Sequence, residues 1–152
     1  MASVNLNDFI PDGCIQISLA NSFLEASSKA ALLLEQAGAV KAGYESEVIQ
    51  IIKENGPYMV LTPQVAIVHG RPSEGTDKTA VAVFISKNEL ISGSKKNDPV
   101  RVIFAISATS NEEHIQMLKT LALFLTTPGV VEKMQQCSTV SEVRDIFSQY
   151  LQ

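Results

Sequence analysis

The chain has few of the features that mark exported, membrane-spanning or nucleic-acid-binding proteins. No apolar run approaches the ~20 residues that span a bilayer, and Met1 to Asn5 include no basic region followed by an apolar core. We therefore expect no direct membrane insertion and, by default, a cytoplasmic location. The formal net charge of −4 argues against nucleic acid as a partner, because binding it requires a concentrated cationic surface.

Cysteine is also scarce, and the two cysteines, Cys14 and Cys137, are far apart with no CxxC spacing. The sequence therefore indicates neither a zinc site nor a thioredoxin-like motif, and we predict two reduced, mostly structural thiols. The chain lacks a Gly-x-x-x-x-Gly-Lys-Ser/Thr loop and an acidic metal-binding cluster. We accordingly expect no cofactor, nucleotide or metal.

The apolar pattern predicts an α/β fold: one domain over residues 1–152, with a mixed, mostly parallel sheet of about five strands and helices on both faces. A length of 152 residues allows one well-buried core. The predicted strands are 14–19, 58–62, 65–68, 79–85 and 100–107. The predicted helices are 6–9, 21–38, 41–53, 111–125, a segment starting near 128–129, and 141–151. For helix 111–125 the expected apolar face consists of Ile115, Leu118, Ala122 and Leu125.

His69 is the first candidate for a reactive side chain, because it ends the short β-branched run of residues 65–68. Open α/β sheets place their ligands at the carboxyl ends of strands. Gly70 has no side chain to obstruct an approaching anion, and Arg71 offers cationic donors suited to phosphate or carboxylate. On these residues alone, a half-buried structural histidine is the more common alternative. A hydrolase with His69 as general base is a weak alternative, since no Gly-x-Ser-x-Gly element accompanies it.

His114, the other histidine, falls in the first turn of a predicted helix, after Ser110 and Glu113 at capping-box spacing. Both histidines follow the carboxyl ends of predicted strands and would share one sheet edge if those strands run parallel. A helix amino terminus favours an anion such as a phosphoryl group. The alternative is a solvent-facing helical histidine.

The segment from Gly56 to Gly75 resembles the active-site region of enzyme IIA proteins of the bacterial sugar phosphotransferase system, in the mannitol/fructose superfamily. The residues that carry this resemblance, closest to the ascorbate-type branch, are Gly56-Pro57-Tyr58, Pro63, Ala66, His69-Gly70-Arg71-Pro72 and Glu74-Gly75. Residues 106–118 resemble the family as well. The family usually has proline just before the histidine, where this chain has Val68.

The resemblance implies a single type-2 enzyme IIA domain that acts as a phosphocarrier. His69 would accept a phosphoryl group from the phosphocarrier protein HPr and pass it to a cysteine of enzyme IIB, driving uptake of a sugar or sugar acid. His114 would stabilise the transferring group, and Gly70 and Arg71 would contact phosphate or partner. The alternative is a regulatory module of the same fold that signals its phosphorylation state by binding a partner.

Lys53 is a further candidate that the resemblance suggests. Mannitol-type members have an arginine upstream of the active histidine, on the preceding helix, and the same spacing leads to Lys53 here. Lysine keeps the positive charge but lacks the bidentate guanidinium.

Overall fold

The computed structural model describes residues 5–71 and 76–149. Its core is a four-stranded sheet in the order β1-β3-β4-β2, formed by β1 (Ile15–Ser18), β2 (Val65–His69), β3 (Ala80–Leu90) and β4 (Val100–Ser107). β1 pairs with β3 and β2 pairs with β4 in parallel, whereas β3 and β4 are antiparallel. The predicted α/β class and mixed sheet are confirmed, with one strand fewer than expected.

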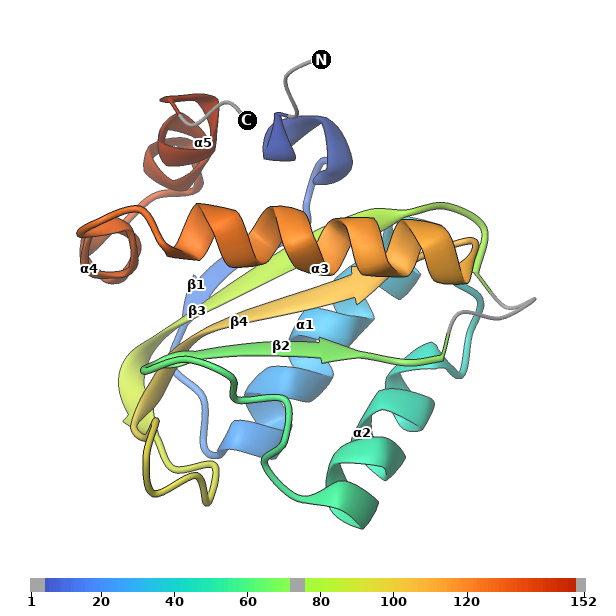
Figure 1. Ribbon diagram of the computed structural model, residues 1–152, viewed down its shortest axis with the longest axis horizontal. Helices are drawn as coiled ribbons and strands as arrows, with labels where there is room; N and C mark the ends of the chain where they lie inside the picture. The colour runs from blue at the N-terminus through green and yellow to red at the C-terminus, as the bar shows by residue number, and fades with distance from the viewer. Residues whose placement is uncertain (1–4, 72–75, 150–152) are drawn as a thin grey trace.

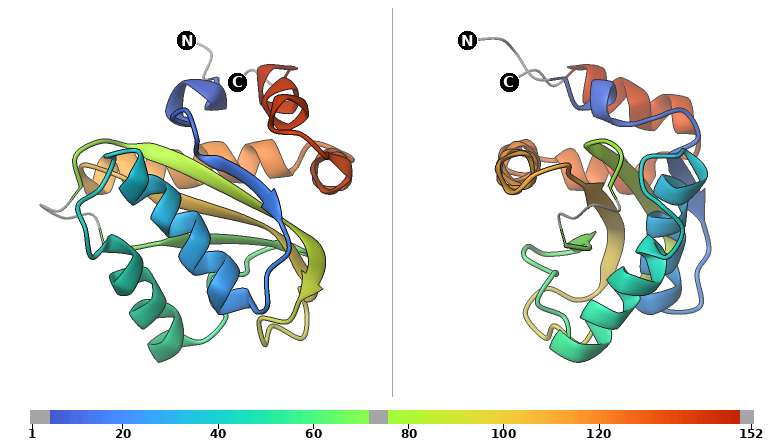
Figure 2. Two further views of the ribbon diagram at one scale, coloured as in Figure 1. Left: turned by 180° about the vertical axis from the view of Figure 1, so that it is seen from behind. Right: turned by 90° about the vertical axis from the view of Figure 1, so that its right-hand side faces the viewer.

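Helices cover both faces of the sheet (Figures 1 and 2). α1 (Phe23–Gln36) packs on β3 and β4, and α2 (Tyr44–Asn55) packs on α1. The opposite face is covered by α3 (Asn111–Leu125) and α4 (Val130–Gln136). α5 (Val140–Gln149) lies against the short 3-10 helix η1 (Leu6–Phe9) beside β1. In this arrangement the central strands are apolar on both sides, as their nearly unbroken runs predict.

The segment 58–62 was predicted to be a fifth strand, and this prediction is wrong. Met59 and Val60 are buried as a strand's residues would be, but the segment forms a turn in which the Val60 amide bonds to the Pro57 carbonyl. Two backbone hydrogen bonds join it to β2, from the Ile67 amide to the Met59 carbonyl and from the Val65 amide to the Thr62 carbonyl, and the only ladder pairing between them is an isolated bridge of Thr62 with Val65. A turn at one end and Pro63 at the other prevent a regular ladder.

The predicted apolar face of helix 111–125 was also partly wrong. The bounds of α3 match the prediction, but its buried side chains are Met117, Leu121 and Phe124. Ile115 is 51% exposed and Ala122 is exposed, while Leu118 and Leu125 are partly buried. Because apolar residues lie on more than one side of this helix, helical spacing could not select the side that packs on the sheet.

The direction of β2 and β4 determines where the candidate residues meet. Since the two strands are parallel, His69 at the end of β2 and Ser107 at the end of β4 lie at the same edge. His69 pairs in register with Ile106, and α3 starts a few residues after β4. Pro72, Glu74 and Gly75 of the sequence motif lie outside the described residues.

Candidate functional site

The structure brings the two histidines of the chain into contact. The imidazole rings of His69 and His114 lie edge to face, with centroids 4.7 Å apart and an interplanar angle of 69°. Both side chains are partly exposed, so the pair is open to solvent. His69 comes from the end of β2 and His114 from the first turn of α3, which Ser110 caps by accepting the amide hydrogen of Glu113. The histidine pair therefore lies where the carboxyl end of a strand meets the amino terminus of a helix, which carries partial positive charge.

The pKa of each imidazole is lower in the protein than in water, so both rings favour the neutral form. Burial lowers the pKa of His69 below its usual value, and the neighbouring His114 lowers it further, while the contact with the Gly70 carbonyl acts in the opposite direction. Burial also lowers the pKa of His114. A neutral imidazole has a free lone pair, so the pair can supply a nucleophile near neutral pH.

One contact indicates which nitrogen of His69 is free. Nδ1 lies 3.4 Å from the carbonyl oxygen of Gly70. If Nδ1 carries the hydrogen it can donate to that oxygen, which leaves the Nε2 lone pair available. The distance is long for a hydrogen bond, but catalytic contacts in a free protein often tighten only in the reacting complex.

Gly70 is needed here for space. Its φ is not in the positive range that favours glycine. A Cβ placed on Gly70 would lie 2.9 Å from Cε1 of Tyr44 and 3.0 Å from Oε1 of Glu47. We expected the missing side chain of Gly70 to leave room for an anion, whereas side chains of Tyr44 and Glu47 from α2 lie in that space.

Tyr44 and Glu47 are residues of the site that sequence reasoning missed. The buried Tyr44 hydroxyl accepts a hydrogen bond from the Gly70 amide at 3.0 Å and donates one to the Ile106 carbonyl, so it joins the ends of β2 and β4. Burial raises the pKa of Tyr44 to about 12, which keeps this hydroxyl protonated. Glu47 Oε1 accepts a 2.7 Å hydrogen bond from the Arg71 amide. In the sequence, Tyr44 could be recognised only as part of an apolar helix face, but a buried tyrosine hydroxyl needs a partner.

The other predicted site residues are placed differently. Arg71 directly follows Gly70 in the chain, and its side chain is exposed. Lys53 lies in the last turn of α2, about 13 Å along the helix axis from Tyr44 at 1.5 Å per residue, and is exposed. The geometry therefore separates Lys53 from the end of α2 that contacts Gly70.

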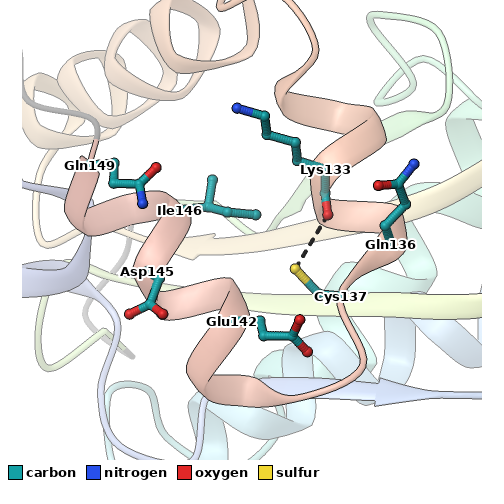
Figure 3. A pocket seen from close by; sticks show the side chains of 7 residues that line it. All are labelled: Lys133, Gln136, Cys137, Glu142, Asp145, Ile146 and Gln149. Carbon is teal, nitrogen blue, oxygen red and sulfur yellow. Dashed lines mark hydrogen bonds between the residues drawn. The ribbon is translucent and has the colours of Figure 1, made fainter.

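A surface pocket of about 370 Å³ between α4 and α5 lies apart from this site (Figure 3). The Cys137 thiol lines it and donates a 3.3 Å hydrogen bond to the Lys133 carbonyl. Burial raises the pKa of this thiol, and the charge of Glu142 raises it further, so it is a poor nucleophile. Among residues 5–71 and 76–149, no group of three or more His, Cys, Asp or Glu side chains could hold a metal ion. The same residues include no helix long and apolar enough to cross a membrane.

Known proteins are similar to this chain in sequence and in fold. The chain is 31% identical over 130 residues to the ascorbate-specific PTS system EIIA component of Salmonella paratyphi A. This alignment covers 84% of this chain and 83% of the relative. The mannitol-specific cryptic phosphotransferase enzyme IIA CmtB of Escherichia coli superposes with a TM-score of 0.85 at 24% identity, covering 97% of this chain and 100% of the other.

A further solved structure is a complex of enzyme IIA and phosphorylated enzyme IIB, both mannitol-specific, from Escherichia coli. It matches with a TM-score of 0.80 and 24% identity, over 93% of this chain and 98% of the matched chain. The family model described as "Phosphoenolpyruvate-dependent sugar phosphotransferase system, EIIA 2" matches residues 8–150. The chain therefore belongs to the EIIA 2 family of the phosphoenolpyruvate-dependent sugar phosphotransferase system.

Proposed function

We propose that the chain is a cytoplasmic phosphocarrier in which His69 accepts a phosphoryl group from phosphorylated HPr and passes it to a cysteine of enzyme IIB. The observation that carries this proposal is the contact between two neutral, solvent-accessible imidazoles at 4.7 Å. Membership of the EIIA 2 family supports it, as does the fold shared with an enzyme IIA bound to its enzyme IIB.

The reaction requires positioning and charge neutralisation more than covalent chemistry. The Nε2 lone pair of His69 attacks phosphorus in line, and the bond from phosphorus to HPr breaks with its electron pair remaining on HPr. In the second step a thiolate of enzyme IIB attacks the same phosphorus, and the electron pair of the P–N bond returns to Nε2. The chain is thus regenerated without a metal or nucleotide.

His114 and Arg71 would act on the phosphoryl oxygens. A neutral His114 ring carries one N–H, which can donate to an oxygen of the group held on His69. The amino terminus of α3 adds partial positive charge in the same place. The exposed Arg71, next to Gly70, can neutralise further charge on the phosphoryl group or on the partner.

The transported substrate is proposed to be a sugar or sugar acid, with an ascorbate-like compound preferred. This preference rests on the 31% identity to the ascorbate-specific relative and on the motif around Tyr58 and Arg71. In the proposed role the site contacts the phosphoryl group and the partner proteins, and the sugar itself does not bind to it.

The test is phosphorylation by phosphoenolpyruvate, enzyme I and HPr, followed by addition of the cognate enzyme IIB. We expect one acid-labile phosphate on the wild type, none on His69→Gln, and transfer of the phosphate to an enzyme IIB thiol. His114→Ala should slow acceptance by about 100-fold, the usual effect of losing one donor to a developing anion. Unchanged acceptance by His69→Gln would eliminate the proposal, and acceptance without onward transfer would favour the regulatory role.

A further inference from the structure

The peptide unit between Gly70 and Arg71 is held at both of its polar ends. Its carbonyl oxygen, on Gly70, faces Nδ1 of His69 at 3.4 Å. Its amide hydrogen, on Arg71, points to Oε1 of Glu47 at an N···O distance of 2.7 Å. A carboxylate, a peptide group and the histidine ring thus form one continuous chain of polar contacts.

The contact with Glu47 is of the strong type. An N–H···O distance of 2.7 Å is at the short end for a bond that a carboxylate accepts. Hydrogen bonds in series polarise one another, so a carboxylate at the amide hydrogen makes the carbonyl oxygen of the same peptide a better acceptor. The carbonyl that faces His69 therefore favours hydrogen on Nδ1 over hydrogen on Nε2.

The fold holds this arrangement firmly. Tyr44 and Glu47 occupy the first turn of α2 at positions i and i+3, which share one helix face. The Tyr44 hydroxyl accepts a hydrogen bond from the Gly70 amide and so fixes the His69–Gly70 peptide. Glu47 accepts one from the Arg71 amide and so fixes the Gly70–Arg71 peptide. A Cβ on Gly70 would lie 3.0 Å from Oε1 of Glu47, so the Glu47 carboxylate fits here because residue 70 has no side chain.

We propose that Glu47 is a positioning residue for phosphoryl transfer, acting through the Gly70–Arg71 peptide to keep hydrogen on Nδ1 of His69 and the lone pair on Nε2. This inference rests on the function proposed above. As phosphorus bonds to Nε2 the ring gains positive charge and Nδ1 becomes a stronger donor. The polarised carbonyl then stabilises the phosphorylated ring without forming or breaking a further covalent bond.

The experiment compares three variants with the wild-type chain. Glu47→Ala removes the acceptor, and Glu47→Gln restores an uncharged acceptor. Glu54→Gln makes the same charge change at an exposed position in the last turn of α2. The tautomer of His69 is measured by nitrogen-15 NMR on the unphosphorylated protein, and the rate of phosphoryl acceptance is measured with phosphorylated HPr. Amide spectra check folding, and Glu47→Asp, whose carboxylate is one methylene short, replaces Glu47→Ala if that variant does not fold.

We expect Glu47→Ala to raise the fraction of His69 with hydrogen on Nε2 and to slow acceptance by about tenfold, as losses of such supporting contacts do. Glu47→Gln should recover the wild-type tautomer and bring the rate within about threefold of wild type, while Glu54→Gln changes neither. The inference is overturned if Glu47→Ala keeps the wild-type tautomer, or if Glu54→Gln shifts it equally. If the wild-type chain takes no phosphate on His69, the proposed function is refuted instead. The two failures can be told apart because the tautomer is measured on the unphosphorylated protein.

Discussion

The ring of His69 meets the ring of His114 edge to face, at a centroid distance of 4.7 Å, although the two residues belong to different secondary-structure elements. At this distance a positive charge on either ring opposes protonation of the other. Burial lowers the pKa of both imidazoles and the pairing lowers that of His69 further, which favours the neutral rings that can act as nucleophile or donor.

Replacing His114 by Gln should raise the pKa of His69. The substitution removes the His114 ring, whose positive charge when protonated lowers this pKa, but the larger cause, burial, remains. The pKa of His69 should therefore move towards the ordinary value of about 6.5 without exceeding it. The measurement is an NMR titration of the His69 ring in both proteins, and a fall or no change in the variant would show that the two rings do not interact as described.

The stability of the protein should decline as pH falls below about 6.5, in part because of the histidine pair. Both histidines have a lower pKa in the folded chain than in the unfolded chain, so the unfolded chain binds more protons in this window. Their contribution is complete above the unfolded value and is lost as pH falls through the folded values. Urea unfolding between about pH 8 and about pH 5.5 should show a smaller decline for His69→Gln/His114→Gln than for wild type. An equal decline in both proteins would contradict the assigned pKa shifts.

Gly70→Ala should destabilise the fold and disturb the site. Reduced entropy of the unfolded chain would stabilise by about 0.4–1 kcal/mol, but overpacking costs about 1–3 kcal/mol. Overpacking should win, because the added Cβ would lie 2.9 Å from the buried ring of Tyr44. Chemical denaturation measures the loss, and the nitrogen-15 spectrum of His69 reports the change at the site. A variant as stable as wild type with an unchanged His69 spectrum would contradict this prediction, because it would show that α2 shifts to accommodate the added Cβ at little cost.

Tyr44→Phe should destabilise the protein by about 1–3 kcal/mol, because it leaves the Gly70 amide and the Ile106 carbonyl without their partner. Tyr58→Phe is the matched control, since Tyr58 is 48% exposed. Urea midpoints of the two variants give the comparison. Equal midpoints would show that water replaces the Tyr44 hydroxyl at no cost.

Much of the fold could be predicted from the sequence because its strong patterns are local. The apolar run of β4 and the capped start of α3 both depend on neighbouring residues, and their predicted bounds agree with the structure. The segment 58–62 is also rich in apolar residues, but its turn and Pro63 prevent a regular ladder. The buried side of α3 depends on contact with the sheet, which helical spacing does not encode.

The candidate site was predictable only in part, for a similar reason. His69 and His114 could be placed at one edge from the expected strand directions, and the parallel pairing of β2 with β4 produces this result. Tyr44 and Glu47 were missed because their roles arise from contacts with a turn far along the chain. Lys53 matched by spacing alone, and spacing does not reveal which end of α2 reaches the turn.

The most direct test of the account is nitrogen-15 and phosphorus-31 NMR on the chain phosphorylated by phosphoenolpyruvate, enzyme I and HPr. We predict one phosphorus coupled to Nε2 of His69, with Nδ1 of the same ring still carrying hydrogen. Phosphorus on Nδ1, on His114 or on any other side chain would contradict the assignment of His69 Nε2 as the acceptor.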